Sequence, residues 1–330
     1  MSMIRSKPGS KPSVESANGP RLSNSKGGTS FWARLWSQRQ LMLMLLPGLI
    51  FYITFRYGPI YGLKISFQEF NAYQGYDNSP WVGFAHFERL FSTDSETFWM
   101  LMKNTLLVGA MTTFIGFPFS IFFALVLNEI RMPKVKKFHQ TVSYLPTFLS
   151  GVIIASIFID LFSNKTGLIN NIIEFFGGER ITFLYEEWGF HLAYQVSGLW
   201  AGVGSGAVIY LSALSAVDQE MYEAAEIDGC SRLKRIWYIT IPSIMPTIVT
   251  MFILNIGGVI RVGADKALLL RTDLTASETK IFATYIYDVG LFGSSKSYAA
   301  AIGLFESAIA ATILIVVNYV AKKRTGNSLW

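Results

Sequence analysis

Six long apolar segments dominate this chain of 330 residues. Each is close to the ~20 residues with which an α-helix crosses the hydrocarbon core of a membrane, and each is apolar for too long to be a strand. Backbone groups in lipid must be satisfied internally, which favours helices. We place the spans at about Leu41–Phe67, Phe98–Leu127, Phe138–Phe162, Phe190–Leu214, Ile239–Val262 and Tyr298–Ala321. The sequence therefore predicts an all-α, polytopic membrane helix bundle.

Prolines interrupt several of these segments. They stand at Pro47, Pro59, Pro118, Pro146 and Pro246. A proline within a span leaves a backbone carbonyl without its usual partner, and such a break persists in lipid only where neighbouring helices satisfy the freed group. We expect the spans to pack into one bundle.

The composition supports a membrane protein and gives no sign of a catalytic centre. Charged residues make up 15% of the chain, whereas soluble domains carry about a quarter. Cys230 is the only cysteine, which excludes an intrachain disulfide and a cysteine-based metal site. The three histidines are scattered without ligand spacing. We expect no metal, no cofactor and no catalytic residue in this chain.

The distribution of lysine and arginine predicts the orientation in the membrane. If the N-terminus lies in the cytosol, the cytosolic segments hold 17 of these residues and the outer loops hold 7. Cytosolic loops are enriched in Lys and Arg, so both termini are expected in the cytosol of a multi-pass cell-membrane protein. The net charge of +6 then reflects topology, and no nucleic-acid partner is needed to explain it.

Three regions follow from this topology. Residues 1–39 are rich in Ser, Gly, Pro and Lys, and we expect a largely disordered cytosolic tail without the apolar core of a secretory signal. Residues 40–324 form the transmembrane domain, with a cytosolic loop at 215–238. Residues 325–330 form a short cytosolic C-terminal tail.

A polar run between the fourth and fifth spans predicts a rigid element on the cytosolic surface. The run reads YEAAEIDGCSRLKRIWYITIP from Tyr222 to Pro242. Asp218 is placed to cap a first helix, and Gly229 can end it in a left-handed conformation. Ser231 can cap a second short helix. Pro242 suits the first turn of a separate membrane helix, because its missing N–H is not needed there.

The same run resembles the coupling loop of permeases from ATP-binding-cassette importers. That loop reads EAA, three residues, Gly, nine residues, Ile, one residue, Leu-Pro. Here Glu223-Ala224-Ala225, Gly229 and Ile239 occur at these spacings, and Ile241-Pro242 differs only by Ile for Leu. The resemblance implies that Glu223, Ala224, Ala225, Gly229 and Pro242 dock onto the ATPase, with Asp228 and Ile239 in supporting roles.

The resemblance covers about Leu41 to Arg324. The stretches LLPGLIFYITFRYGPIYGLKISFQEFN, WVGFAHFERLF and KNTLL are similar to the sugar-permease branch, and more narrowly to permeases for oligosaccharides or polysaccharides. It implies a type I importer permease fold in the lipid bilayer. The implied partners are a second homologous permease, two cytosolic ATP-binding subunits, an extracytoplasmic solute-binding protein and a carbohydrate solute. No Walker phosphate loop occurs in this sequence, which places ATP hydrolysis on another subunit.

Polar and aromatic residues within the spans are candidates for the solute path. An arginine inside a span is costly, which makes Arg56 a candidate, although it can also snorkel to the outer interface. Glu306 and Asn255 can bond sugar hydroxyls or a neighbouring helix. Trp200 and Tyr210 can stack on sugar rings or simply pack. The glycine-rich AGVGSGA stretch at 201–207 indicates close helix packing.

Two other functions stay open at this point. A permease for peptides, amino acids or another solute would share the coupling loop. A membrane-bound enzyme would need acidic, histidine or metal-ligand residues gathered across helices, and the sequence shows no such set.

Overall fold

A computed structural model of the chain describes residues 36, 38–293, 295–326 and 328–329. The chain divides into two units, Met1–Pro59 and Ile60–Trp330, which are described separately. Most of the predicted tail at 1–39 lies outside the described residues. The C-terminal tail expected at 325–330 is described only in part, and the last helix includes Thr325.

The first unit consists of α2, Arg39–Tyr52, and a π-helical turn, Ile53–Tyr57. The chain continues from there into a 3₁₀-helix, Gly58–Phe67, so that Arg39–Phe67 forms one apolar helical stretch of 29 residues. Pro47 lies inside α2 without ending it. The first span predicted at Leu41–Phe67 is therefore confirmed as a helix of membrane-spanning length.

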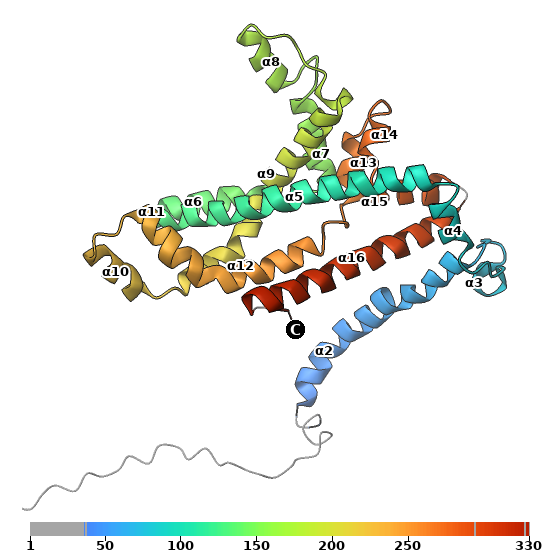
Figure 1. Ribbon diagram of the computed structural model, residues 1–330, viewed down its shortest axis with the longest axis horizontal. Coiled ribbons are helices and arrows are strands. Elements are labelled where there is room, and N and C mark those ends of the chain that lie inside the picture. The colour runs from blue at the N-terminus through green and yellow to red at the C-terminus, as the bar shows by residue number, and fades with distance from the viewer. Residues whose placement is uncertain (1–35, 37, 294, 327, 330) are drawn as a thin grey trace, which may run out of the picture. The chain divides into compact units, whose positions relative to one another are not determined.

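The second unit is built from helices, and its described residues form no strand beyond an isolated bridge between Gln68 and Trp81. Figure 1 shows α10 and α11 at one end of its long helices and α3 and α4 at the other. Its elements, after Phe67, are α3 Gly75–Asn78, α4 Ala85–Phe91, α5 Ser95–Glu129, α6 Pro133–Tyr144, η3 Leu145–Phe148, α7 Gly151–Leu161, α8 Leu168–Phe175, η4 Phe183–Tyr185, α9 Glu187–Ser215, α10 Gln219–Ile227, α11 Arg232–Arg235, η5 Ile236–Thr240, α12 Ile241–Ile256, α13 Ala264–Leu270, α14 Ala276–Thr279, α15 Phe282–Tyr287, η6 Asp288–Phe292 and α16 Lys296–Thr325.

Among the described residues, five helices are long and apolar enough to cross a membrane, or six if a bent pair counts as one span. The prediction of about six helical spans is thus confirmed, and α5, α9 and α16 each extend a few residues beyond the predicted bounds.

The third span differs from its prediction. Phe138–Phe162 is not one helix: Pro133–Phe148 and Gly151–Leu161 meet at a bend of 101°. Leu149 and Ser150 adopt extended backbone angles at this bend, and the Ser150 hydroxyl caps α7 by accepting from the Ile153 N–H at 3.3 Å. Pro146, with no N–H to donate, lies just before the break. A hydropathy pattern records only the apolar length and cannot reveal such a bend.

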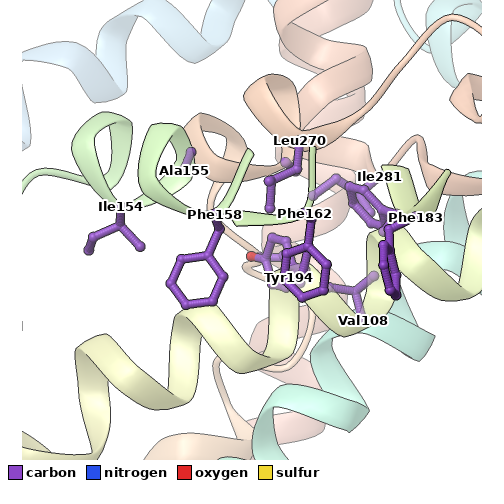
Figure 2. Close-up of a cluster of buried hydrophobic side chains, with 13 residues drawn as sticks. Val108, Ile154, Ala155, Phe158, Phe162, Phe183, Tyr194, Leu270 and Ile281 are labelled. Atoms are coloured by element: carbon purple, nitrogen blue, oxygen red, sulfur yellow. The ribbon is translucent and has the colours of Figure 1, made fainter. Parts of the chain in front are cut away.

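The largest buried cluster joins α7, α9 and α13. Figure 2 shows Phe158 of α7 and Phe162, which directly follows this helix, next to Tyr194 of α9, with Leu270 of α13 beside them. These side chains are almost fully excluded from solvent. Because the cluster includes Leu270 of α13 and Tyr194 of α9, it packs α13, the helix that follows α12, against α9.

Glycines allow α9 to lie close to its neighbours. A Cβ added at Gly204 would collide with the Ser143 carbonyl of α6, and one at Gly206 would lie 2.7 Å from Ser120 Oγ of α5. Close approach of this kind is characteristic of small residues at helix interfaces in membranes. The close packing predicted for the AGVGSGA stretch is confirmed at these two positions.

Replacing Gly204 by alanine is expected to destabilise the protein, because the neighbouring backbone carbonyl cannot move aside as a side chain can. Overpacking of this kind costs roughly 1–3 kcal/mol. Gly202→Ala is the matched control on the same helix, since a Cβ there meets nothing within 4 Å. The melting temperature of the purified protein should fall for Gly204→Ala only; equal values for the two variants would contradict this packing.

Candidate functional site

The exposed helix α10 begins where the sequence predicted. The carboxylate of Asp218 accepts a hydrogen bond from the backbone N–H of Glu220 at 3.0 Å, which satisfies one of the unpaired donors in the first turn. Glu220 adds negative charge beside the positive end of the helix dipole. The short helix is therefore stabilised locally at its start.

The end of α10 is fixed by Gly229. Its φ of +71° lies in the left-handed region, where a side chain would be strained. The N–H of Gly229 donates to the Glu226 carbonyl at 3.1 Å, and the N–H of Cys230 donates to the Ala225 carbonyl at 2.9 Å. This pair of bonds is a Schellman motif, which closes the helix and turns the chain sharply.

Two side-chain contacts attach α10 to the next helical segment. The Tyr222 hydroxyl lies 3.0 Å from the hydroxyl of Thr240, which is buried. Arg235 Nη1 donates to Glu226 Oε2 at 3.0 Å. These contacts come from one side of α10. Glu223, Ala224, Asp228 and Gly229 are exposed, and Ala225 is half-buried.

The segment after α10 corrects the predicted break at Pro242. α11, η5 and α12 form one continuous helix of 25 residues, Arg232–Ile256. Ser231 does precede α11, although its side chain makes no capping bond. The predicted fifth span, Ile239–Val262, therefore starts earlier and ends earlier than expected.

A π-helical turn explains why Pro242 does not begin a new helix. The N–H of Ile241 donates to the Ile236 carbonyl, one residue further back than in an α-helix. An extra residue in the turn relieves the clash that a proline ring makes with the carbonyl four residues before it. Ile239 lies within this turn and is half-buried. α10 is thus joined to the interior of the bundle by an unbroken helix.

A second candidate site is a cavity of about 290 Å³ between α5, α9 and α12, termed here the central pocket. Hydroxyl and amide groups line it together with glycines and apolar side chains. The Thr112 hydroxyl lies 3.1 Å from Gln195 Oε1, and Gln195 Nε2 donates to the Val108 carbonyl at 3.3 Å. The polar lining residues are Thr112, Ser120, Gln195, Ser205, Tyr210 and Asn255.

A neighbouring cavity of about 300 Å³, termed the Arg261 pocket, shares Thr112 and Asn255 with the central pocket. Arg261 and Tyr194 also line it. Asn255 donates to the Met251 carbonyl of its own helix at 2.8 Å, and its side chain is exposed. The two cavities therefore meet at a threonine on α5 and an asparagine near the end of α12.

The structure separates the four predicted path residues. Asn255 lines both pockets. Glu306 of α16 lies close enough to Arg261 for an electrostatic interaction. Trp200 packs beside the Phe158 ring at 6.0 Å and lines neither pocket. Arg56 belongs to the π-helical turn of the first unit, which is described by itself, so the structure does not bring it together with the others.

Sequence reasoning missed Arg261 and Lys266 as members of this region. The Lys266 ammonium donates to the Tyr194 carbonyl at 2.7 Å and lies 3.7 Å from the centre of the Tyr194 ring. Burial disfavours its charged form and lowers the pKa of Lys266 to about 8. The available signal was the occurrence of two cations within six residues at the end of the predicted fifth span. Arg261 was interpreted only as a cation at the end of a span, and Lys266 only as a cation of an outer loop.

Helices of membrane-spanning length, an exposed helix at one end and polar pockets between the spans are the features expected of a membrane transport permease. The chain belongs to the family described as binding-protein-dependent transport system inner membrane component, which matches residues 116–325.

Relatives cover nearly the whole chain. The polygalacturonan/rhamnogalacturonan transport system permease protein YteP of Bacillus subtilis (strain 168) is 42% identical over 88% of this chain and 90% of its own length. Protein LplB of the same organism is 38% identical over 90% and 92%.

Solved structures show the same fold. A chain of a bacterial ABC transporter involved in the import of the acidic polysaccharide alginate matches with a TM-score of 0.80 and 34% identity, over 89% of this chain and 99% of that one. A chain of the alginate transporter in complex with an alginate pentasaccharide-bound periplasmic protein matches with a TM-score of 0.81 and 32% identity, over 91% and 99%. The predicted fold of an ATP-binding-cassette importer permease is thereby confirmed.

The contacts of α10 predict that Tyr222→Phe will loosen this helix, because its link to the buried Thr240 hydroxyl is lost and that hydroxyl keeps only the Arg235 carbonyl, at 3.4 Å, as a partner. A lost hydrogen bond of this type costs about 0.5–1.5 kcal/mol. Hydrogen exchange of the α10 amides should accelerate several-fold, with that of α9 unchanged. Tyr238→Phe is the control, since Tyr238 is exposed and its hydroxyl makes no hydrogen bond with a described residue. Equal exchange in both variants would contradict the role of the Tyr222–Thr240 contact.

Proposed function

We propose that this chain is the permease subunit of an ATP-driven importer of carbohydrates, namely oligosaccharides or polysaccharide fragments, and that it couples to a cytosolic ATPase through α10. The observation that carries the proposal is the unbroken helix Arg232–Ile256. It links the exposed α10 at one end with Asn255, in the wall of both pockets, at the other.

The coupling surface is the exposed side of α10 and the turn that follows it. Glu223 can pair with a cationic or amide group of the ATPase, while Ala224 and Ala225 allow a close approach. Asp228 and Gly229 shape the end of the helix, and Ile239 and Pro242 support the turn that joins it to α12. ATP hydrolysis then belongs to two separate cytosolic subunits, and this chain is not itself an enzyme.

A motion of the ATPase would reach the pockets through this connection. A helix seated on a moving partner is displaced with it, provided that its own attachments hold. Tyr222 and Glu226 supply these attachments, through Thr240 and Arg235. The displaced helix would open the pockets to either side of the membrane in turn, a rigid-body form of alternating access.

The proposed solute follows from the relatives and from the lining of the central pocket. The named relatives and structures concern polygalacturonan, rhamnogalacturonan and alginate. Hydroxyl and amide side chains of the kind found at Thr112, Gln195 and Asn255 can exchange hydrogen bonds with sugar hydroxyls. No feature of the described residues favours a peptide or amino acid over a sugar.

Asn255 also argues for a second permease. Its exposed amide lies near the end of a membrane helix, where contact with lipid would leave polar groups without partners. A homologous permease packed against this face would cover it and close the path. An extracytoplasmic solute-binding protein, of the kind named for the alginate transporter, would deliver the solute from the side opposite α10.

The orientation proposed for this assembly places both termini and α10 in the cytosol. Figure 1 shows the C-terminal end of α16 directed toward the side of the bundle that carries α10. Basic residues occur at this side in α6, in α11 and in the last turn of α16. Such a concentration is typical of cytosolic membrane faces.

Glu223→Lys and Gly229→Asp are each expected to abolish uptake and co-purification of the ATPase, with the chain still inserted in the membrane. The first reverses a charge on the docking surface, and the second forces a side chain into the left-handed conformation. Glu179→Lys makes the same charge reversal on an exposed residue of an outer loop and should leave co-purification of the ATPase as in the wild type. Normal ATPase capture by Glu223→Lys and Gly229→Asp would overturn the coupling role.

Asn255→Leu is expected to raise the KM for oligosaccharide uptake about tenfold, while the ATPase still co-purifies. The substitution removes a polar group shared by both pockets and leaves α10 intact. Uptake is measured in proteoliposomes containing the complete transporter and its binding protein. Thr250→Val is the control on the same helix, because the Thr250 hydroxyl bonds its own backbone and lines neither pocket. Unchanged uptake by Asn255→Leu would remove Asn255 from the path.

A further inference from the structure

Arg261 lines a pocket with its side chain, which forms no ion pair with a described residue. It follows α12 and lines the Arg261 pocket together with Asn255 and Thr112. Its side chain is exposed, and it makes no hydrogen bond or ion pair with a described residue. The guanidinium is therefore free to meet a group that enters the pocket.

Among the described residues, Arg261 is the only charged one in the lining of the two pockets. Lys266 adds a second positive charge from α13, held against Tyr194, which lines the same pocket. Neither pocket is lined by an aspartate or a glutamate. Glu306 of α16 acts on Arg261 electrostatically, but no oxygen of its carboxylate lies within ion-pair distance of the guanidinium.

An arginine that lines a pocket between membrane helices is a candidate for binding a solute group. Its planar fork of N–H donors matches both oxygens of a carboxylate, and such charge-assisted contacts are about twice as strong as neutral hydrogen bonds. Sugar hydroxyls need no such group, because the amides and hydroxyls of the central pocket already provide donors and acceptors.

We propose that Arg261 recognises a carboxylate of the passing solute, so that the path selects oligosaccharides built from acidic sugar units. The inference rests on the proposed function as a carbohydrate permease and adds the charge class of the cargo. Asn255 and Thr112 hold hydroxyl groups of the same sugar unit. Glu306 competes for Arg261, which keeps the solute contact weak enough for release.

The test compares a galacturonic acid trisaccharide with its carboxyl-reduced, neutral counterpart. The complete transporter, including its ATPase and binding protein, is reconstituted in proteoliposomes, and uptake of each sugar is measured beside binding-protein-stimulated ATP hydrolysis. Arg261→Gln should lower uptake of the acidic trisaccharide at least about tenfold, with uptake of the neutral one within about twofold of wild type. Stimulated ATP hydrolysis should persist, because docking at α10 is unaffected.

Three further variants sharpen the result. Arg261→Lys keeps the charge but loses the planar pair of N–H donors. Its uptake of the acidic sugar should lie between that of the wild type and that of Arg261→Gln. Glu306→Gln removes the competing carboxylate and should lower the KM for that sugar. Lys296→Gln removes an exposed charge at the start of α16, away from both pockets, and should change neither uptake.

The outcomes separate this inference from the function on which it rests. Equal loss of both sugars in Arg261→Gln would show that Arg261 has a structural role and would overturn carboxylate recognition. Unchanged uptake of the acidic trisaccharide would overturn it as well. If the wild-type transporter imports neither sugar while its ATPase docks, the proposed carbohydrate function fails together with this inference.

Discussion

The helix Arg232–Ile256 stays continuous although its sequence contains prolines, and this continuity is the constraint on which both candidate sites depend. Pro242 stands in its first half, where an α-helical register would set the ring against a carbonyl. The π-helical turn Ile236–Thr240 absorbs this conflict and leaves the helix continuous. At 1.5 Å per residue, the helix extends about 37 Å. Both candidate sites depend on it, because α10 is bonded to one end and Asn255 stands near the other.

The contacts at the two ends differ in character. α10 is closed by a side-chain cap at Asp218 and a glycine turn at Gly229, and it is bonded to the long helix through Thr240 and Arg235. These are local, well-defined interactions that favour one geometry. Around the pockets, by contrast, Asn255 and Arg261 are exposed and Arg261 has no bonding partner among the described residues. The hydrogen-bonded contacts thus fix α10 to the long helix, whereas the Arg261 pocket is lined by an exposed amide and by an arginine that makes no hydrogen bond through its side chain to a described residue.

Much of this arrangement follows from the sequence, since it depends on local chemistry. Apolar length alone predicted the spans, and the preference of Asp for an N-cap and Gly for a left-handed turn predicted both ends of α10. The bend of 101° at Ser150 and the continuity through Pro242 could not be predicted, because tertiary packing decides whether a proline breaks a helix or is accommodated. The sequence made both Trp200 and Asn255 candidates for the path and left packing open for Trp200; the structure packs Trp200 of α9 beside Phe158 of α7, away from both pockets.

Arg261 illustrates how topology and function can compete for the same residue. In a count of lysines and arginines it is one cation at the end of a span, and such a cation can serve as an interfacial anchor. An anchor would direct its side chain to headgroups, whereas Arg261 lines a pocket beside Asn255 and feels the charge of Glu306 on another helix. The Glu306 carboxylate reduces the positive potential at Arg261 but makes no ion pair with it, so the N–H donors of the guanidinium stay available. That balance suits a path, because a solute must be attracted strongly enough to enter and weakly enough to leave.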